Sequence, residues 1–168
     1  MDDIAAESGM STRTVYRYFP AKDDILVGRF AGSAALFLAT LKARPVAEPV
    51  WTSLRAAFEP LTQHVDRRQD HVSVRTLHRA IFSTPALLGR YLQQLHAAQQ
   101  EAVELIRDHP PGGQHVDRTS QSLVLLATVS AAVACFVAAQ ETWSRADTAL
   151  PLSAVLDEAM SSVAALTT

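Results

Sequence analysis

The side chains best suited to chemistry lie near the N-terminus, where hydroxyl, phenol and guanidinium groups recur within Gly9–Phe19. Arginine can read guanine through two parallel hydrogen bonds, whereas threonine, tyrosine and lysine typically contact phosphates. At about 100° per residue, Arg13 and Arg17 share one helix face. The opposite face carries Val15, Tyr18 and Phe19. The spacing therefore predicts a helix that packs on one side and can touch DNA on the other.

Two short helices joined by a turn must position these side chains. The preceding residues, Asp3–Ser8, can form the first helix, which Gly9 ends because glycine takes a left-handed C-terminal conformation without penalty. Ser11 or Thr12 can cap the second helix. Pro20 stops that helix. The segment is thus predicted to be a helix-turn-helix, a unit whose second helix enters a DNA major groove.

Residues 3–26 resemble the DNA-binding segment of the TetR family of repressors, through Ile4-Ala5, Gly9-Met10-Ser11, Thr14-Val15-Tyr16, Tyr18-Phe19, Lys22 and Leu26. The resemblance implies an all-α protein, with a helix-turn-helix head and a helical bundle that binds a small ligand and dimerises. It also implies that the start of the recognition helix approaches bases. Carried over by position, it implies contacts with a double-stranded DNA operator from Thr12, Arg13, Thr14, Tyr16, Arg17, Tyr18 and Lys22.

The N-terminal segment departs from the family pattern in two ways. The family's first helix is missing, so we expect a late start codon or a shortened chain. If that helix buries three or four apolar side chains, its loss removes about 5 to 10 kcal/mol. Residues 1–30 also carry four basic and five acidic side chains, so the segment is not a basic patch. The alternative function is therefore a helical ligand-sensing or interaction dimer that has lost DNA binding.

Composition agrees with a soluble, helical, intracellular protein, expected to be cytoplasmic. The 168 residues carry a net charge of -2, and the N-terminus lacks the basic-then-apolar order of a signal peptide. A single cysteine, Cys135, cannot form an intramolecular disulfide and is expected to be a buried small hydrophobe. The chain lacks the HExxH, GxSxG and glycine-rich phosphate-loop motifs. We therefore predict no catalytic residues and no cofactor.

Three histidines recur every seven residues, at His64, His71 and His78. On one helix such residues are about 10.5 Å apart along the axis, whereas the ligands of one zinc ion lie within about 2.1 Å of it. We therefore expect solvent-facing or core histidines and no metal site.

Apolar periodicity and the positions of proline and glycine predict an all-α chain in two parts. Arg44–Pro49 contains two prolines and marks the boundary between a head with its connecting helix, residues 1–43, and a ligand-binding and dimerisation domain, residues 44–168. Thr84 is a capping residue followed by a proline at the first helical position. Helices are expected at 23–42, 51–68, 71–82, 85–106, 120–144 and 153–166.

Residues 119–140 carry no charge and could be taken for a membrane span. The apolar core of this segment would rise only about 25 Å as a helix, short of the roughly 30 Å hydrocarbon thickness. A helix that is apolar all round is also expected where its own domain and a partner subunit both cover it. We therefore expect no membrane segment and a homodimer through helices near 120–144 and 152–166, which the resemblance implies.

A ligand pocket is expected among inward-facing side chains between residues 51 and 106 and on the long apolar helix. The pattern Trp51, Leu54-Arg55, Pro85 and Trp143 resembles an actinobacterial branch of the family in which some members sense acyl-coenzyme A thioesters. The effector is thus expected to be apolar or an acyl thioester. Arg67, Arg68, Arg75 and Arg79 could instead bind an anion, lie in solvent or pair with Asp66 and Asp70. The pocket candidates are Phe58, His64, Leu77, Ile81, Phe82, Tyr91, Leu95 and Trp143.

The family's usual mode is repression that a ligand relieves. In a dimer, recognition helices about 34 to 36 Å apart reach successive major grooves of a palindromic operator, and a ligand that changes this spacing releases DNA. The sequence leaves activation open as an alternative to repression.

Overall fold

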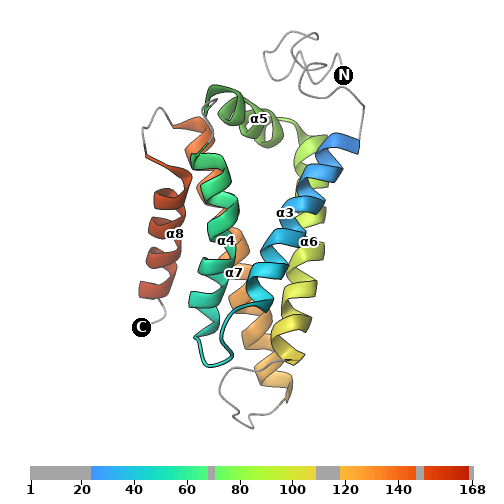
Figure 1. Ribbon diagram of the computed structural model, residues 1–168, viewed down its shortest axis with the longest axis vertical. Helices are drawn as coiled ribbons and strands as arrows, with labels where there is room; N and C mark the ends of the chain where they lie inside the picture. Colours follow the sequence, from blue (N-terminus) through green and yellow to red (C-terminus); the bar gives the residue numbers. More distant parts are fainter. Residues whose placement is uncertain (1–23, 68–70, 109–117, 147–149, 167–168) are drawn as a thin grey trace.

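The computed structural model of the protein describes residues 24–67, 71–108, 118–146 and 150–166 (Figure 1). Within these ranges it has six helices and no strand. The expected helix-turn-helix, with all seven expected DNA contacts from Thr12 to Lys22, lies outside the described residues. The fold is therefore described from the connecting helix onward.

The described helices are α3 (Asp24–Lys42), α4 (Val50–Asp66), α5 (His71–Ser83), α6 (Pro85–Asp108), α7 (Arg118–Arg145) and α8 (Leu152–Leu166). Each bound lies within two residues of the one expected from apolar periodicity. The all-α fold class is thus confirmed for the described part of the chain.

Five of these helices run roughly along the long axis of the molecule, and α5 lies across the end where α3 begins (Figure 1). Helix α3 packs against α4 and α6, α5 packs against α6 and α7, and α8 packs against α4 and α7. The connecting helix α3 is thus one of the packed helices of the bundle.

Stacked aromatic rings from three helices form the centre of the core. Phe58 of α4 lies between Phe37 of α3, at a centroid distance of 4.7 Å, and Phe136 of α7, at 4.5 Å. Such ring pairs add about 0.5 to 1.5 kcal/mol each beyond the burial of their area. The largest fully buried side chains around this stack are Trp143, Leu54, Leu152, Leu156 and Val129. Cys135 is buried among them, as expected.

Side chains from α4 and α5 satisfy the ends of α7 and α8. Both carboxylate oxygens of Asp66 accept hydrogen bonds from the first backbone amides of α8, at 2.7 Å from Leu152 and 3.2 Å from Ser153. Arg75 donates to the Ala146 carbonyl at 2.7 Å, and Arg79 donates to the Ser144 carbonyl at 3.0 Å. These groups therefore cap helices.

Helix α6 begins at Pro85, as expected, but the side-chain cap expected from Thr84 is absent. Thr84 is 3% exposed and its hydroxyl oxygen has no hydrogen-bond partner among the described residues. Backbone bonds do form here, from the Thr84 amide to the Ala80 carbonyl and from the Leu88 amide to the Thr84 carbonyl. Thr84 is the single residue between the end of α5 at Ser83 and the start of α6 at Pro85. The expectation of a hydroxyl cap was wrong because this tight junction buries the Thr84 side chain.

One described helical segment, Ser122–Arg145 within α7, is long and apolar enough by length and composition to cross a membrane, and 28% of its apolar window is buried. A core helix of a bundle passes the same test. The inward face of α7 supplies Val129, Ala132, Phe136 and Ala139 to the core, so this face is already covered by the chain's own helices.

Candidate functional site

A cavity of about 410 Å³ lies among α3, α4, α5, α6 and α7, at the end of the bundle that α5 crosses. This volume falls in the range of about 300 to 1,000 Å³ that is typical of small-molecule sites. The cavity wall brings together seven of the eight pocket candidates: Phe58, His64, Leu77, Ile81, Phe82, Tyr91 and Leu95.

The eighth candidate, Trp143, does not line this cavity. It is 1% exposed, its indole N–H donates to the Leu150 carbonyl at 3.2 Å, and the Arg75 guanidinium lies 4.5 Å from the centre of its ring. Trp143 also meets the His78 ring edge-on at 5.7 Å. It is therefore a core side chain behind the cavity wall, because α5 and the loop before α8 cover it.

The described side chains that line the cavity include no aspartate, glutamate, lysine or arginine. Most are aliphatic or aromatic, and the polar ones are Ser33, His64, His78, Tyr91, Gln94, Gln99 and Gln140. An ionised group inside such a wall would lose its hydration without gaining a counter-charge. The cavity therefore suits an apolar group that makes few hydrogen bonds.

The most deeply buried polar contact of the wall joins two helices. The Tyr91 hydroxyl on α6 donates to the Gln140 side-chain oxygen on α7, and the two residues are 5% and 7% exposed. Phe82 of α5 meets the Tyr91 ring edge-on at 5.9 Å. Burial raises the pKa of Tyr91 well above its usual range, although the bond to Gln140 opposes the rise. The phenol therefore remains a protonated donor.

Of the three histidines that recur every seven residues, His64 lies on α4, whereas His71 and His78 lie on α5. An axial separation of about 10.5 Å therefore holds only between His71 and His78. The His78 Nδ1 lies 2.9 Å from the Val74 carbonyl, so this nitrogen carries the proton. Among the described residues, no group of three or more histidine, cysteine, aspartate or glutamate side chains could hold a metal ion.

The connecting helix supplies part of the wall that the sequence did not indicate. Gly32, Ser33, Ala34, Leu36 and Phe37 of α3 line the cavity, and Leu36 is 44% exposed at its edge. Gln140 was also missed. Gln140 could have been noticed as an amide side chain at the end of the uncharged run 119–140. Periodicity alone does not say which helices lie opposite Gln140.

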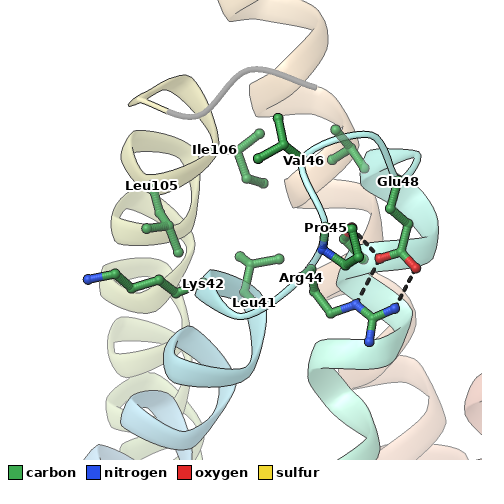
Figure 2. Close-up of a pocket in the computed structure, with 10 residues that line it drawn as sticks. Leu41, Lys42, Arg44, Pro45, Val46, Glu48, Leu105 and Ile106 are labelled. Carbon is green, nitrogen blue, oxygen red and sulfur yellow. Dashed lines mark hydrogen bonds and ion pairs between the residues drawn. The ribbon is translucent and has the colours of Figure 1, made fainter. Parts of the chain in front are cut away.

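A second, smaller cavity of about 150 Å³ lies at the opposite end of α3, between the α3–α4 turn and the end of α6 (Figure 2). Figure 2 shows the Arg44 guanidinium turned toward the Glu48 carboxylate, with the Lys42 amine pointing away from that pair. Arg44 Nε donates to Glu48 at 2.8 Å and the Ser53 hydroxyl donates to it at 2.6 Å. These contacts fix the turn, and they pair Arg44 with Glu48 beside this cavity.

The geometry defines a class of protein: a helical bundle with an internal apolar cavity whose wall includes the helix that leads to the N-terminal segment. Comparison with protein families gives the family. Residues 1–28 match the model of bacterial regulatory proteins of the tetR family, and residues 48–168 match the MftR C-terminal domain. The second match covers well over half of the chain, so the chain belongs to the TetR family. A comparison with curated proteins finds no match.

Membership establishes the general function. The chain is a DNA-binding transcriptional regulator and not an enzyme. The DNA-contact residues expected from Thr12 to Lys22 lie within the first matched segment, and their contacts with DNA stay a prediction.

Proposed function

We propose that this regulator is a ligand-responsive repressor that binds a palindromic operator as a homodimer. The observation that carries the proposal is the uncharged cavity of about 410 Å³ with α3 in its wall. If α3 can adopt two positions in the bundle, a ligand that binds more tightly to one of them shifts the equilibrium toward that position. Since residues 1–28 match the family's DNA-binding model and α3 follows from them, a shift of α3 moves the recognition helix.

The cavity also supports a class of effector. Because its described wall has no charged side chain, the group inside is an apolar molecule or the acyl part of a thioester. Charged phosphates of a coenzyme would stay in solvent outside the wall. The exposed edge at Ser33 and Leu36 offers a route by which a chain could enter while its head group remains outside.

The outward face of α7 supports the dimer. Leu123 and Val124 are 67% and 65% exposed, and Ala127, Ala134 and Ala138 continue the same exposed apolar surface along the helix. Water contact with such a surface is unfavourable, and a two-fold partner would cover it with an identical one. The proposed interface pairs α7 and α8 with the same helices of a second subunit, within residues 120–144 and 152–166.

DNA binding is tested by fluorescence anisotropy with labelled DNA from the gene's own upstream region. Arg13→Ala should weaken binding by roughly tenfold to a hundredfold, because a base contact contributes about 1 to 3 kcal/mol. Tyr16→Phe and Lys22→Ala should reduce affinity on all sequences, and Lys22→Ala should lower the salt dependence by about one counterion. Arg107→Ala removes the same charge from the exposed end of α6 and should leave affinity unchanged.

Ligand response is tested in the same titration with lauroyl-coenzyme A. The proposal expects the operator affinity to fall as this thioester is added, while free coenzyme A has no effect because it lacks the acyl chain. An operator complex that is indifferent to both would argue against ligand-induced release. Failure of the chain to bind the DNA, together with a stable dimer, would favour the alternative of a ligand-sensing or interaction dimer without DNA binding.

A further inference from the structure

We infer that Gln140 is the polar recognition residue of the cavity, and that the occupant is a neutral molecule whose carbonyl oxygen accepts a hydrogen bond from the Gln140 amide. This inference rests on the proposed function, since it assigns the chemistry of the same cavity. The occupant is expected to carry a ketone, ester or thioester carbonyl on an apolar body, and not a free carboxylate.

The Tyr91 hydroxyl fixes the orientation of the Gln140 amide. The Tyr91 hydroxyl donates to Gln140 Oε1, so the amide nitrogen, which has two N–H donors and no acceptor, is left for another partner. Burial keeps the pKa of Tyr91 raised, so the phenol stays a donor across the physiological range. Because Gln140 lines the cavity, an occupant that displaces water there can accept a hydrogen bond from these N–H groups.

A carbonyl oxygen fits this donor better than the other common oxygen groups do. It accepts hydrogen bonds and brings no hydrogen that needs an acceptor of its own. A hydroxyl would bring a hydrogen that must find a second, correctly placed acceptor in a mostly apolar wall. A carboxylate would bring a charge, and the described wall holds no lysine or arginine to balance it.

The other glutamines of the wall are less suited to this role. The Gln99 amide donates to the Ser130 hydroxyl at 2.8 Å, which ties it to α7. Gln94 is half-buried, so water can satisfy its amide. Gln140 is the most buried of the three glutamines in the described wall, at 7% exposed, and its oxygen is already bonded to Tyr91. An occupant that displaces water from the cavity therefore does best when it offers the Gln140 N–H groups an acceptor in place of that water.

The size of the cavity sets the size of the apolar body. A cavity of about 150 Å³ holds one benzene molecule. At about 410 Å³, this cavity has nearly three times that volume and accommodates roughly 15 heavy atoms. A ligand held at Gln140 on α7 can then extend its apolar part to Leu36 and Phe37 on α3, which links the proposed dimer helix to the connecting helix.

The test uses a matched pair of probes that differ in the carbonyl alone. Hexyl phenyl ketone and heptylbenzene have the same skeleton, with a methylene in place of the carbonyl in the second. Both are used to displace the neutral dye N-phenylnaphthylamine from the native protein and from Gln140→Leu. We expect the ketone to lose about tenfold in affinity in Gln140→Leu, the loss of one hydrogen bond, while heptylbenzene binds at least as tightly as before.

Two further variants sharpen this result. Tyr91→Phe frees the Gln140 amide to rotate and should weaken the ketone several-fold without weakening heptylbenzene. Gln93→Leu makes the same chemical change on the exposed side of α6 and should leave both probes unaffected. Retained heptylbenzene binding in Gln140→Leu also shows that the cavity still folds.

The outcomes separate the two proposals. Equal changes for ketone and heptylbenzene in Gln140→Leu would overturn the role of Gln140 and leave the ligand cavity standing. Tighter binding of para-hexylbenzoate than of the ketone to the native protein would overturn the neutral carbonyl. If neither the dye nor any probe binds the native protein, the ligand cavity itself fails, and the proposed function loses its support.

Discussion

Glu48 shows how one carboxylate can hold a turn in place. Bonds from Arg44 and then from Ser53 stabilise its charged form and lower its pKa from 4.5 to about 2. A carboxylate with a lowered pKa in the folded state stabilises the fold above its unfolded pKa, and this contribution is lost as the pH falls toward the folded value. Glu48 therefore contributes fully near neutral pH and little near pH 2.

We predict that Glu48→Gln lowers the urea midpoint at neutral pH and that its difference from the native protein shrinks as the pH falls from about 4.5 to about 2. The measurement is urea unfolding followed by circular dichroism across this range. Glu158→Gln, at an exposed position of α8, is the matched control and should change the midpoint little at any pH. A deficit for Glu48→Gln that is independent of pH would show that shape, and not charge, stabilises the turn.

At the scale of the element, α6 carries a glycine that nothing around it requires. Gly89 lies in the interior of the helix at an exposed position, and an added Cβ there would meet no atom within 4 Å. Glycine in a helix interior costs about 0.5 to 1 kcal/mol relative to alanine, because it loses more backbone freedom on folding.

Gly89→Ala should therefore raise the free energy of unfolding by about 0.5 to 1 kcal/mol. The measurement is chemical denaturation, in which the dependence of the free energy of unfolding on denaturant concentration should stay unchanged. The reverse substitution at an exposed position of the same helix, Ala97→Gly, should lower the free energy of unfolding by a similar amount. If Gly89→Ala instead destabilises the protein, the position contacts something beyond the described chain, such as a second subunit.

For the whole molecule, the open question is what covers the outward face of α7. Only 28% of its apolar window is buried, although the inward face supplies a large part of the core. Ala134 lies on this exposed face near the middle of the helix. In the proposed dimer a charge at this position would be moved out of water without a partner, which costs several kcal/mol.

Ala134→Glu is thus expected to weaken the dimer at least about a hundredfold and to lower operator affinity with it. Sedimentation velocity over a range of protein concentrations gives the first quantity, and anisotropy gives the second. Ala97→Glu adds the same charge to the exposed face of α6 and should leave a dimer intact. Identical sedimentation of Ala134→Glu and the native protein would place the interface elsewhere.

The spacing of apolar residues along the sequence predicts most of the secondary structure of this protein. Each described helix could be predicted to within two residues, because apolar side chains repeat with the helical period and prolines and glycines mark the ends. The same stripes placed Phe58, Tyr91 and five other candidates on inward faces, and the cavity lies where those faces meet. The N-terminal pattern pointed to the TetR family, which the family comparison confirms.

Only the tertiary structure decided which inward faces meet a cavity and which meet the core. Trp143 belongs to the core because α5 covers it, whereas Gln140, one turn earlier, reaches the cavity and meets Tyr91 from a distant helix. The roles of Arg75 and Arg79 also depend on where α7 ends in space. Periodicity tells which side of a helix faces inward, but contacts between helices depend on how those sides are brought together, and no local spacing encodes this.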